Sequence, residues 1–207
     1  GVSTYAVEVF INGYLAEKTS LSGAKAAFEY NTQGLLEHEY SRWSGSAYQV
    51  QVDTVYWDGT NHPKTVTHTD GKVEYTYAWD ATAKTRTVTA RNYKNTTLVS
   101  TVTTRHNAFD QPQYIWGDGA TPTEFVYDTL GRQTEMKTWR TGAYTGGNWP
   151  AGLENLATTT WVYKDPGGLL WKKLYEGDST EAPGIEYQYH LLGRLSRRTW
   201  DRGVYIA

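Results

Sequence analysis

The segment FVYDTLGRQTEMKTW at Phe125–Trp139 carries the pattern that decides the fold of this chain. Two aromatic residues separated by one position are followed by an aspartate, two further residues and Gly-Arg. A second copy, YQYHLLGRLSRRTW, lies at Tyr187–Trp200, and looser copies are FEYNTQGLLEHEY at Phe28–Tyr40 and WVYKDPGGLLWKKLY at Trp161–Tyr175. A phrase that recurs along a chain is typical of a structure built from similar units stacked side by side.

Each copy of the pattern predicts a β-hairpin. The alternation of a strand places Phe125 and Tyr127 on one face of the incoming strand. We expect Asp128 to accept hydrogen bonds from backbone N–H groups of the turn, and Gly131 to adopt the positive φ that the turn needs. The residues that follow form the return strand. Because one hairpin is only marginally stable in water, the units must pack against one another.

Period-2 alternation also dominates between the copies, where TVTHT (Thr65–Thr69), RTVTA (Arg86–Ala90) and LVSTVTT (Leu98–Thr104) are rich in β-branched residues. We interpret Leu15–Tyr30 as strand, turn and strand rather than helix, because Ser22-Gly23 interrupts it. The sequence therefore predicts an all-β fold: an elongated, curved antiparallel sheet of stacked hairpins that forms a barrel-like or shell segment.

Alignment on the aromatic residue four positions before the glycine defines a repeat register. Its members are Tyr30, Tyr127, Tyr163 and Tyr189, with Trp57, Trp79 and Phe109 in degenerate copies. The longest interval contains residues 141–160, a Gly-, Asn- and Thr-rich stretch that we predict to be an extended loop. We predict that residues 1–207 form one repeat domain that belongs to a longer protein.

The bulk composition excludes several classes of protein. The 207 residues carry a formal net charge of -2, which gives no electrostatic reason to expect a nucleic acid or an anionic membrane as partner. The chain contains no Cys, so disulfides and thiolate metal sites are excluded. No apolar run is long enough to span a membrane, and we find no signal-peptide pattern, so we expect a targeting segment outside this sequence.

The pattern aromatic-x-Tyr-Asp-x-x-Gly-Arg resembles the YD repeats of bacterial Rhs proteins, insecticidal toxin complexes and animal teneurins. Tyr127–Arg132 matches it fully, and Tyr189–Leu195 matches it with His190 in place of the aspartate. The ending Arg197–Val204 looks like the spacer that follows many Rhs repeats. The resemblance implies architectural roles for Tyr30, Gly34, Tyr127, Asp128, Gly131, Arg132, Tyr163, Gly167, Tyr189, Gly193 and Arg194.

The resemblance also implies a function. Proteins of this family form a long sheet of stacked hairpins that spirals into a hollow shell, so the expected function is a non-enzymatic structural module of a secreted or cell-surface bacterial protein. The expected partners are neighbouring repeats of the parent chain and, in the complete protein, an enclosed toxin domain. The autoprocessing core of the family is not visible here. Lys164–Gly167 resembles its Asp-Pro element only superficially, so we expect neither self-cleavage nor a toxin within this chain.

Carbohydrate binding is the alternative function, because the chain is unusually aromatic, with 17 Tyr, 9 Trp and 4 Phe. Rings outside the repeat register (Trp43, Trp116, Trp139, Tyr144 and Trp149 among them) are the better candidates for stacking on the C–H face of a sugar, with neighbouring polar side chains binding its hydroxyls. The predicted glycan-binding residues are Trp116, Asp118, Tyr144, Asn148 and Trp149.

The sequence offers little support for catalysis or metal binding. His62 and His68 share a face of an apparent strand, but no third ligand lies at a useful spacing. Acidic pairs such as Asp53 and Asp58 lie near each other, but Asp58 belongs to a turn. We predict no catalytic residue, no cofactor and no metal ligand.

Overall fold

The computed structural model describes residues 5–42, 47–144, 147–164, 168–178, 184–200 and 205–206. These residues form β-strands and turns, and none of them is helical. Within the described segments there is accordingly no helix of the length and apolarity that a membrane crossing requires. The prediction of an all-β fold is confirmed.

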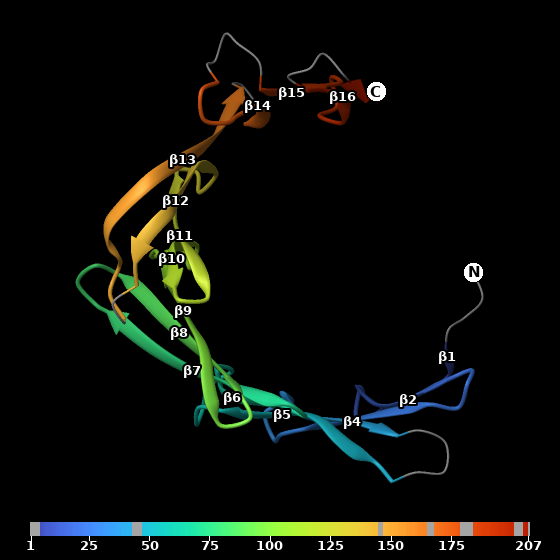
Figure 1. Cartoon of the computed structure of the whole chain (residues 1–207). Helices are drawn as coiled ribbons and strands as arrows, with labels where there is room; N and C mark the ends of the chain where they lie inside the picture. Colours follow the sequence, from blue (N-terminus) through green and yellow to red (C-terminus); the bar gives the residue numbers. More distant parts are fainter. Residues whose placement is uncertain are drawn as a thin grey trace. The chain divides into compact units, whose positions relative to one another are not determined.

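The described chain contains 17 strands, and the chain reverses direction after almost every one (Figure 1). They are β1 (Tyr5–Ile11), β2 (Tyr14–Ser20), β3 (Lys25–Tyr30), β4 (Leu36–Arg42), β5 (Gln49–Tyr56), β6 (Pro63–His68), β7 (Gly71–Asp80), β8 (Thr85–Lys94), β9 (Thr97–His106), β10 (Pro112–Gly117), β11 (Ala120–Tyr127), β12 (Gln133–Ala143), β13 (Ala151–Lys164), β14 (Leu169–Leu174), β15 (Ile185–Tyr189), β16 (Leu195–Thr199) and β17 (Tyr205–Ile206).

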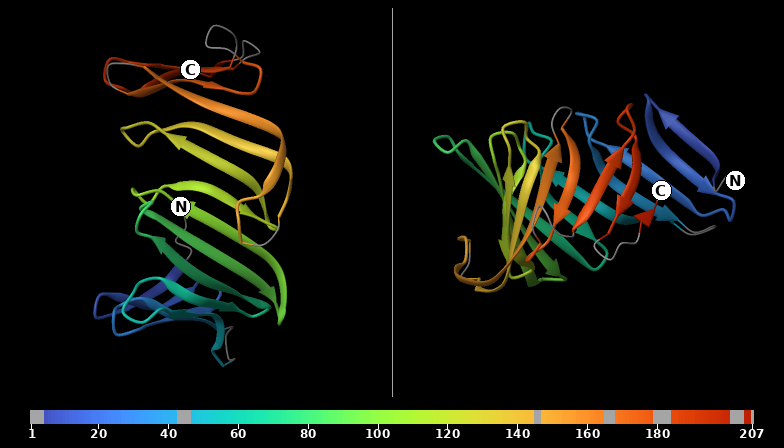
Figure 2. Two further views of the ribbon diagram at one scale, coloured as in Figure 1. Left: turned by 90° about the vertical axis from the view of Figure 1, so that its left-hand side faces the viewer. Right: turned by 90° about the horizontal axis from the view of Figure 1, so that it is seen from above.

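The contacts divide the chain into two compact units. Unit 1 comprises residues 1–77 and 89–101, and unit 2 comprises residues 78–88 and 102–207. In unit 1, each strand from β1 to β7 pairs antiparallel with the next one along the chain. In unit 2, the same order runs from β9 to β17, so strands adjacent in sequence lie side by side (Figure 2). The assignment of residues 1–207 to one domain stays a prediction.

The sheet of unit 2 has two chemically different faces. Phe125 lies opposite Met136, so both share a face with Tyr127, two residues further along β11. We call this the tyrosine face. Glu124 lies opposite Lys137 on the other face, with 3.8 Å between carboxylate and ammonium. We call this the charged face.

Unit 1 has the same division. Phe28 and Tyr30 lie on one face of β3, whereas Glu29 lies on the other, opposite His38, which in turn lies opposite Asp53 of β5. The hairpin pattern therefore separates aromatic from charged side chains in both units, as strand alternation requires.

Few side chains in this sheet are fully covered. Among the described residues, the buried apolar side chains are those of Trp116, Leu174 and Ile185, and most others are half-exposed. Side chains in each unit therefore pack mainly against neighbours within the sheet, rather than beneath a second layer. Contacts between adjacent hairpins become correspondingly important for stability.

The prediction of an extended loop over residues 141–160 is wrong. Residues Ala151–Lys164 form β13, and only residues 144–150 connect it to β12. The strand begins early because Leu156 lies opposite Trp139 and Glu154 lies opposite Thr141. Gly152 and Asn155, which suggested a loop, adopt φ of 64° and 55° within the strand. The interpretation of residues 15–30 as strand, turn and strand is confirmed.

Replacement of Leu174 by Ala should lower the free energy of unfolding by about 2–3 kcal/mol, because the side chain is 7% exposed and its loss leaves a cavity. Leu192→Ala is the matched control, since this side chain is 84% exposed and its loss should change stability by less than about 0.5 kcal/mol. Urea denaturation followed by circular dichroism measures both. Equal stability of the two variants would contradict the described packing.

Candidate functional site

Five tyrosine hydroxyls link a hairpin to the preceding hairpin in the chain. Each hydroxyl donates a hydrogen bond to a backbone carbonyl of the neighbouring return strand, and we call the set the tyrosine ladder. The bonds are Tyr30 to Leu15 (3.1 Å), Tyr56 to Leu36 (2.7 Å), Tyr77 to Pro63 (3.1 Å), Tyr127 to Pro112 (2.7 Å) and Tyr163 to Gln133 (2.8 Å).

The accepting carbonyls occupy equivalent places in their hairpins. Leu36 lies opposite Tyr30, and Gln133 lies opposite Tyr127, so the acceptor faces the ladder residue of its own hairpin. The strand register shifts immediately before both pairs, which places one extra residue in the return strand. The hydroxyl therefore binds a carbonyl at the point where regular pairing of the hairpin is interrupted.

The turn of the motif is held by the aspartate. Asp128 Oδ1 accepts the backbone N–H groups of Leu130 and Arg132, both at 2.9 Å, and Oδ2 accepts Arg132 Nε at 2.7 Å. Gly131 adopts φ of 77°. The predicted turn geometry at Asp128 and Gly131 is confirmed.

Other turns repeat this geometry with different side chains. Asn31 Oδ1 accepts the N–H groups of Gln33 and Leu35 at 2.9 and 3.0 Å. In the turn with His190, the backbone bond from His190 N–H to the Arg194 carbonyl is 2.9 Å long, and Gly193 has φ of 73°. The backbone therefore keeps the turn even where histidine replaces the acidic side chain.

The residue after the turn glycine contacts the next hairpin. The Arg132 guanidinium lies 4.4 Å from the centre of the Tyr163 ring, a cation–π contact. Tyr14 occupies the matching place against Tyr30, with ring centres 4.9 Å apart. Arg132 thus connects Asp128 of its own turn with the ladder tyrosine of the next hairpin.

The turn glycines also make room for these side chains. A Cβ on Gly168 would lie 2.5 Å from Arg132 Nη1, and a Cβ on Gly34 would overlap the Tyr14 hydroxyl. Both glycines have positive φ, 64° and 77° respectively. They are therefore required by backbone conformation and by the side chain of the preceding hairpin. Gly167, the predicted motif glycine, lies outside the described residues.

The environment shifts the ionisation of the motif side chains. Burial raises the pKa of Tyr127 and of Tyr163 above the ordinary phenol value. For Asp128, burial acts to raise the pKa, but the hydrogen bonds from Arg132 and Leu130 outweigh it and hold the pKa below its usual value. The shifts favour the neutral phenols of Tyr127 and Tyr163, which donate the ladder hydrogen bonds, and the ionised carboxylate of Asp128, which binds its turn and Arg132.

The predicted register is wrong at the degenerate copies. The ladder residues are Tyr56 and Tyr77 rather than Trp57 and Trp79. In hairpin β9–β10, Phe109 lies within the turn, at the position that Leu130 has in its own turn. His106 occupies the position that corresponds to Tyr127 of the motif. Asp110, with φ of 60°, occupies the position that corresponds to Gly131. The position four residues before the motif glycine did not identify the ladder residue in these hairpins, because their turns differ in length from the Asp128 turn or lack the glycine.

Two of the predicted glycan-binding rings lie inside an aromatic cluster. Trp149 contacts Tyr114, Trp116 and Trp139 edge-on, with ring centres 4.8, 5.7 and 5.8 Å apart. Trp116 is 4% exposed, so its ring faces are covered in this conformation. The cluster packs Trp149 against β10 and β12.

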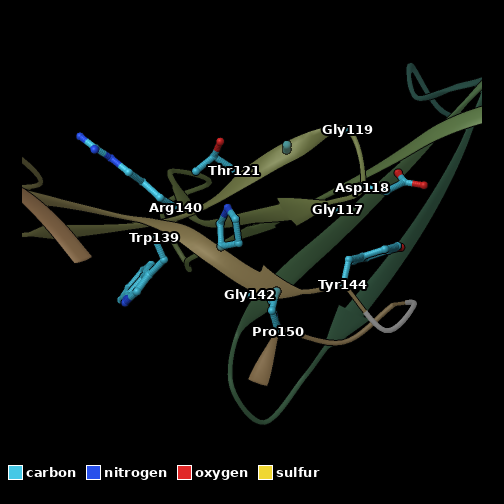
Figure 3. A pocket seen from close by; sticks show the side chains of 11 residues that line it. Gly117, Asp118, Gly119, Thr121, Trp139, Arg140, Gly142, Tyr144 and Pro150 are labelled. Carbon is cyan, nitrogen blue, oxygen red and sulfur yellow. The ribbon is translucent and has the colours of Figure 1, made fainter. Parts of the chain in front are cut away.

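The other predicted glycan-binding residues are only partly brought together. Asp118 and Tyr144 line a groove of about 390 Å³ (Figure 3), whereas Asn148 is exposed and does not line it. Trp139 and Arg140 also line the groove, but they point to opposite sides of β12 (Figure 3). Glycan binding stays a prediction, and Trp43 lies outside the described residues.

The described residues contain no cluster of three His, Asp or Glu side chains able to hold a metal ion. His62 instead stacks on the ladder residue Tyr77, with ring centres 4.7 Å apart and an interplanar angle of 15°. This role was not predicted from the sequence. The signal was its position immediately before Pro63, which matches Arg132 before Gln133.

Comparison with known proteins shows similarity of fold. No family model matches the chain, and no curated protein matches it. Similar solved structures are the crystal structure of TcdB2-TccC3 (TM-score 0.58), the same pair without its hypervariable C-terminal region (0.58) and the Photorhabdus luminescens Tc holotoxin pore (0.56). Each is 14% identical to this chain and matches 93% of it.

The chain spans only 12% of the length of each of these similar chains. At 14% identity the likeness shows a common fold with toxin-complex chains. Membership of the YD-repeat family stays a prediction that this likeness supports.

Tyr127→Phe removes one ladder hydrogen bond and keeps the ring, so it should lower the free energy of unfolding by about 1 kcal/mol. Tyr175→Phe is the matched control, because the Tyr175 ring is 46% exposed and lies outside the ladder. Urea denaturation at pH 7 compares them. Equal midpoints would show that the ladder bond contributes nothing to stability.

Asp128→Asn keeps an oxygen for the turn amides, as Asn31 shows, but removes the charge that holds Arg132. The folded pKa of Asp128 is lowered, so its contribution is present above the unfolded value near pH 4 and is lost as pH falls through the folded value. The variant should be less stable than the wild type at pH 7, and the difference should shrink as the pH falls through the folded pKa of Asp128. A difference that is independent of pH would contradict the charge interaction.

Proposed function

We propose that this chain is a non-enzymatic wall segment of a secreted or cell-surface bacterial protein of the Rhs type, in which stacked YD hairpins form a shell around a cargo. The tyrosine ladder is the observation that carries this proposal. Hairpins β3–β4, β5–β6 and β11–β12 each supply a hydroxyl to the hairpin before and a carbonyl to the hairpin after, so the same contact can be repeated along an array.

Three polar side chains of the motif make contacts within the sheet. The Tyr127 hydroxyl binds a backbone carbonyl, the Asp128 carboxylate holds its turn, and the Arg132 guanidinium lies between that carboxylate and the Tyr163 ring. Side chains engaged in this way serve the architecture of the sheet. This supports a structural role for the motif rather than a catalytic one.

The fold of the similar structures supports the same proposal. Toxin-complex chains about eight times longer contain a region with this fold, since the present chain corresponds to 12% of their length. A sheet with few buried side chains and two distinct faces suits a wall that separates an interior from the solvent. Enclosure of a cargo and a location outside the cell are parts of the proposal.

Cysteine labelling in the parent protein tests the wall proposal. Glu135 and Arg140 lie on β12, on the charged face and the tyrosine face respectively. The chain itself contains no Cys, so Glu135→Cys and Arg140→Cys each create one thiol within this segment. In the isolated chain, both thiols should react readily with a bulky maleimide.

In the full-length parent, a wall predicts that one face is protected and the other remains reactive. Strong protection of one thiol, by about ten-fold or more in labelling rate, is the expected result. Equal reactivity of both thiols in the full-length parent would contradict the proposal. Denaturation of the parent, which should restore equal labelling, is the control for intrinsic reactivity.

A further inference from the structure

The tyrosine ladder is open at Tyr189. By the register of the other hairpins, the acceptor of this hydroxyl would be the carbonyl of Leu170, which lies opposite Tyr163. Among the described residues, however, the Tyr189 hydroxyl makes no hydrogen bond. Burial, with a smaller effect of Tyr187, raises the pKa of Tyr189. The structure thus places an unused phenol donor in a partly desolvated position.

A groove lies at this open position. Strands β14 and β15 pair only at Lys172 with Glu186 and at Lys173 with Ile185. By contrast, β12 and β13 pair along most of their length, and the Tyr163 hydroxyl closes the ladder there. Beyond the short pairing of β14 and β15, their ends diverge around a groove of about 490 Å³.

The groove combines apolar and polar side chains with unpaired strand edges. Leu169, Leu170 and Trp171 line it from β14, Tyr187 and Tyr189 line it from β15, and Leu191 lines it from the following turn. The polar side chains of Lys164, Glu186, Gln188 and His190 complete the lining. Strand edges without a neighbour present backbone N–H and C=O groups that another extended chain can pair with. The leucine and tryptophan side chains of the lining suit an apolar side chain of such a segment.

We propose that this groove binds an extended peptide segment, whose backbone carbonyl accepts the Tyr189 hydroxyl and whose apolar side chain packs on Trp171 and Leu191. The ladder itself supports this choice of ligand, because every ladder hydroxyl binds a backbone carbonyl. Peptide binding and the wall function are tested at different residues, because the thiol-labelling positions Glu135 and Arg140 in β12 lie outside the groove. Either proposal can therefore fail without the other.

The chain's own sequence provides a probe. In QGLLEHEY (residues 33–40), the Leu36 carbonyl accepts the Tyr56 hydroxyl, and two leucines follow the turn glycine. A fluorescein-labelled peptide of this sequence, with blocked ends, would be titrated with the whole chain of residues 1–207. Fluorescence anisotropy measures binding, and a peptide of scrambled sequence is the control ligand.

Two pairs of variants separate the groove from the rest of the chain. Tyr189→Phe should weaken peptide binding about five-fold, the effect of one lost hydrogen bond, whereas Tyr175→Phe should leave it unchanged. Leu191→Asp should also weaken binding, whereas Leu192→Asp should not, because Leu192 is in the same turn but does not line the groove. Both leucines are almost fully exposed, so neither change should unfold the protein.

Saturable binding with these dependences supports the proposal. It would be overturned by a probe that does not bind, by equal binding of the scrambled peptide, or by unchanged affinity of Tyr189→Phe. A loss of stability in Tyr189→Phe equal to that in Tyr127→Phe would show that the hydroxyl closes the ladder in solution and is not available to a ligand. Saccharide binding that depends on Tyr189, without peptide binding, would assign the groove to a different class of ligand.

Discussion

The hydrogen bond from a tyrosine hydroxyl to the backbone carbonyl of the preceding hairpin is the interaction on which the rest of this structure depends. A hairpin by itself buries too little surface to be stable in water. In this sheet few side chains are covered from above, so adjacent hairpins must be held by contacts along their shared edge. The tyrosine supplies both a ring for packing and a donor for an interrupted strand edge.

The remaining motif residues serve this one contact. The carboxylate of Asp128 fixes a turn in which Gly131 adopts positive φ, and it orients Arg132. The Arg132 guanidinium then covers the ring of Tyr163, the ladder residue of the next hairpin. Each motif of this kind therefore contacts two neighbouring hairpins. Its tyrosine binds the preceding hairpin, and its arginine packs on the following hairpin. This division explains why the phrase repeats with variable spacing, because strand length between motifs does not alter the contact.

Sequence alone was sufficient for the local structure of the motif. Alternation and turn residues predicted the hairpins, and the acceptor role of Asp128 followed from its place before a turn glycine. The tyrosine-to-carbonyl bond was not predictable in this way, because a backbone acceptor leaves no mark on the sequence. His106 and Asp110 escaped notice for a related reason: the backbone keeps the turn although both side chains differ from the motif. Trp116 is covered by Trp149, which lies far from it in sequence, after β12. No local sequence pattern predicts this contact.

The open position at Tyr189 shows how a repeated contact can acquire a second use. Where the ladder is closed, the hydroxyl contributes to stability; where it is open, the same chemistry is directed at a groove between two hairpins. A wall segment with such a groove would combine an architectural role with recognition of an extended chain. The two proposals thus derive from one interaction, although each can fail without the other.

The exchange rate of tyrosine hydroxyl protons, measured by NMR on protein with labelled tyrosine rings, tests the ladder most directly. Hydroxyls of the five ladder residues should exchange slowly with water, because each is bonded to a carbonyl: Tyr30, Tyr56, Tyr77, Tyr127 and Tyr163. The hydroxyl of Tyr189 should exchange fast. Fast exchange at all five tyrosines would contradict the account, because it would mean that the hairpins are held together without the ladder.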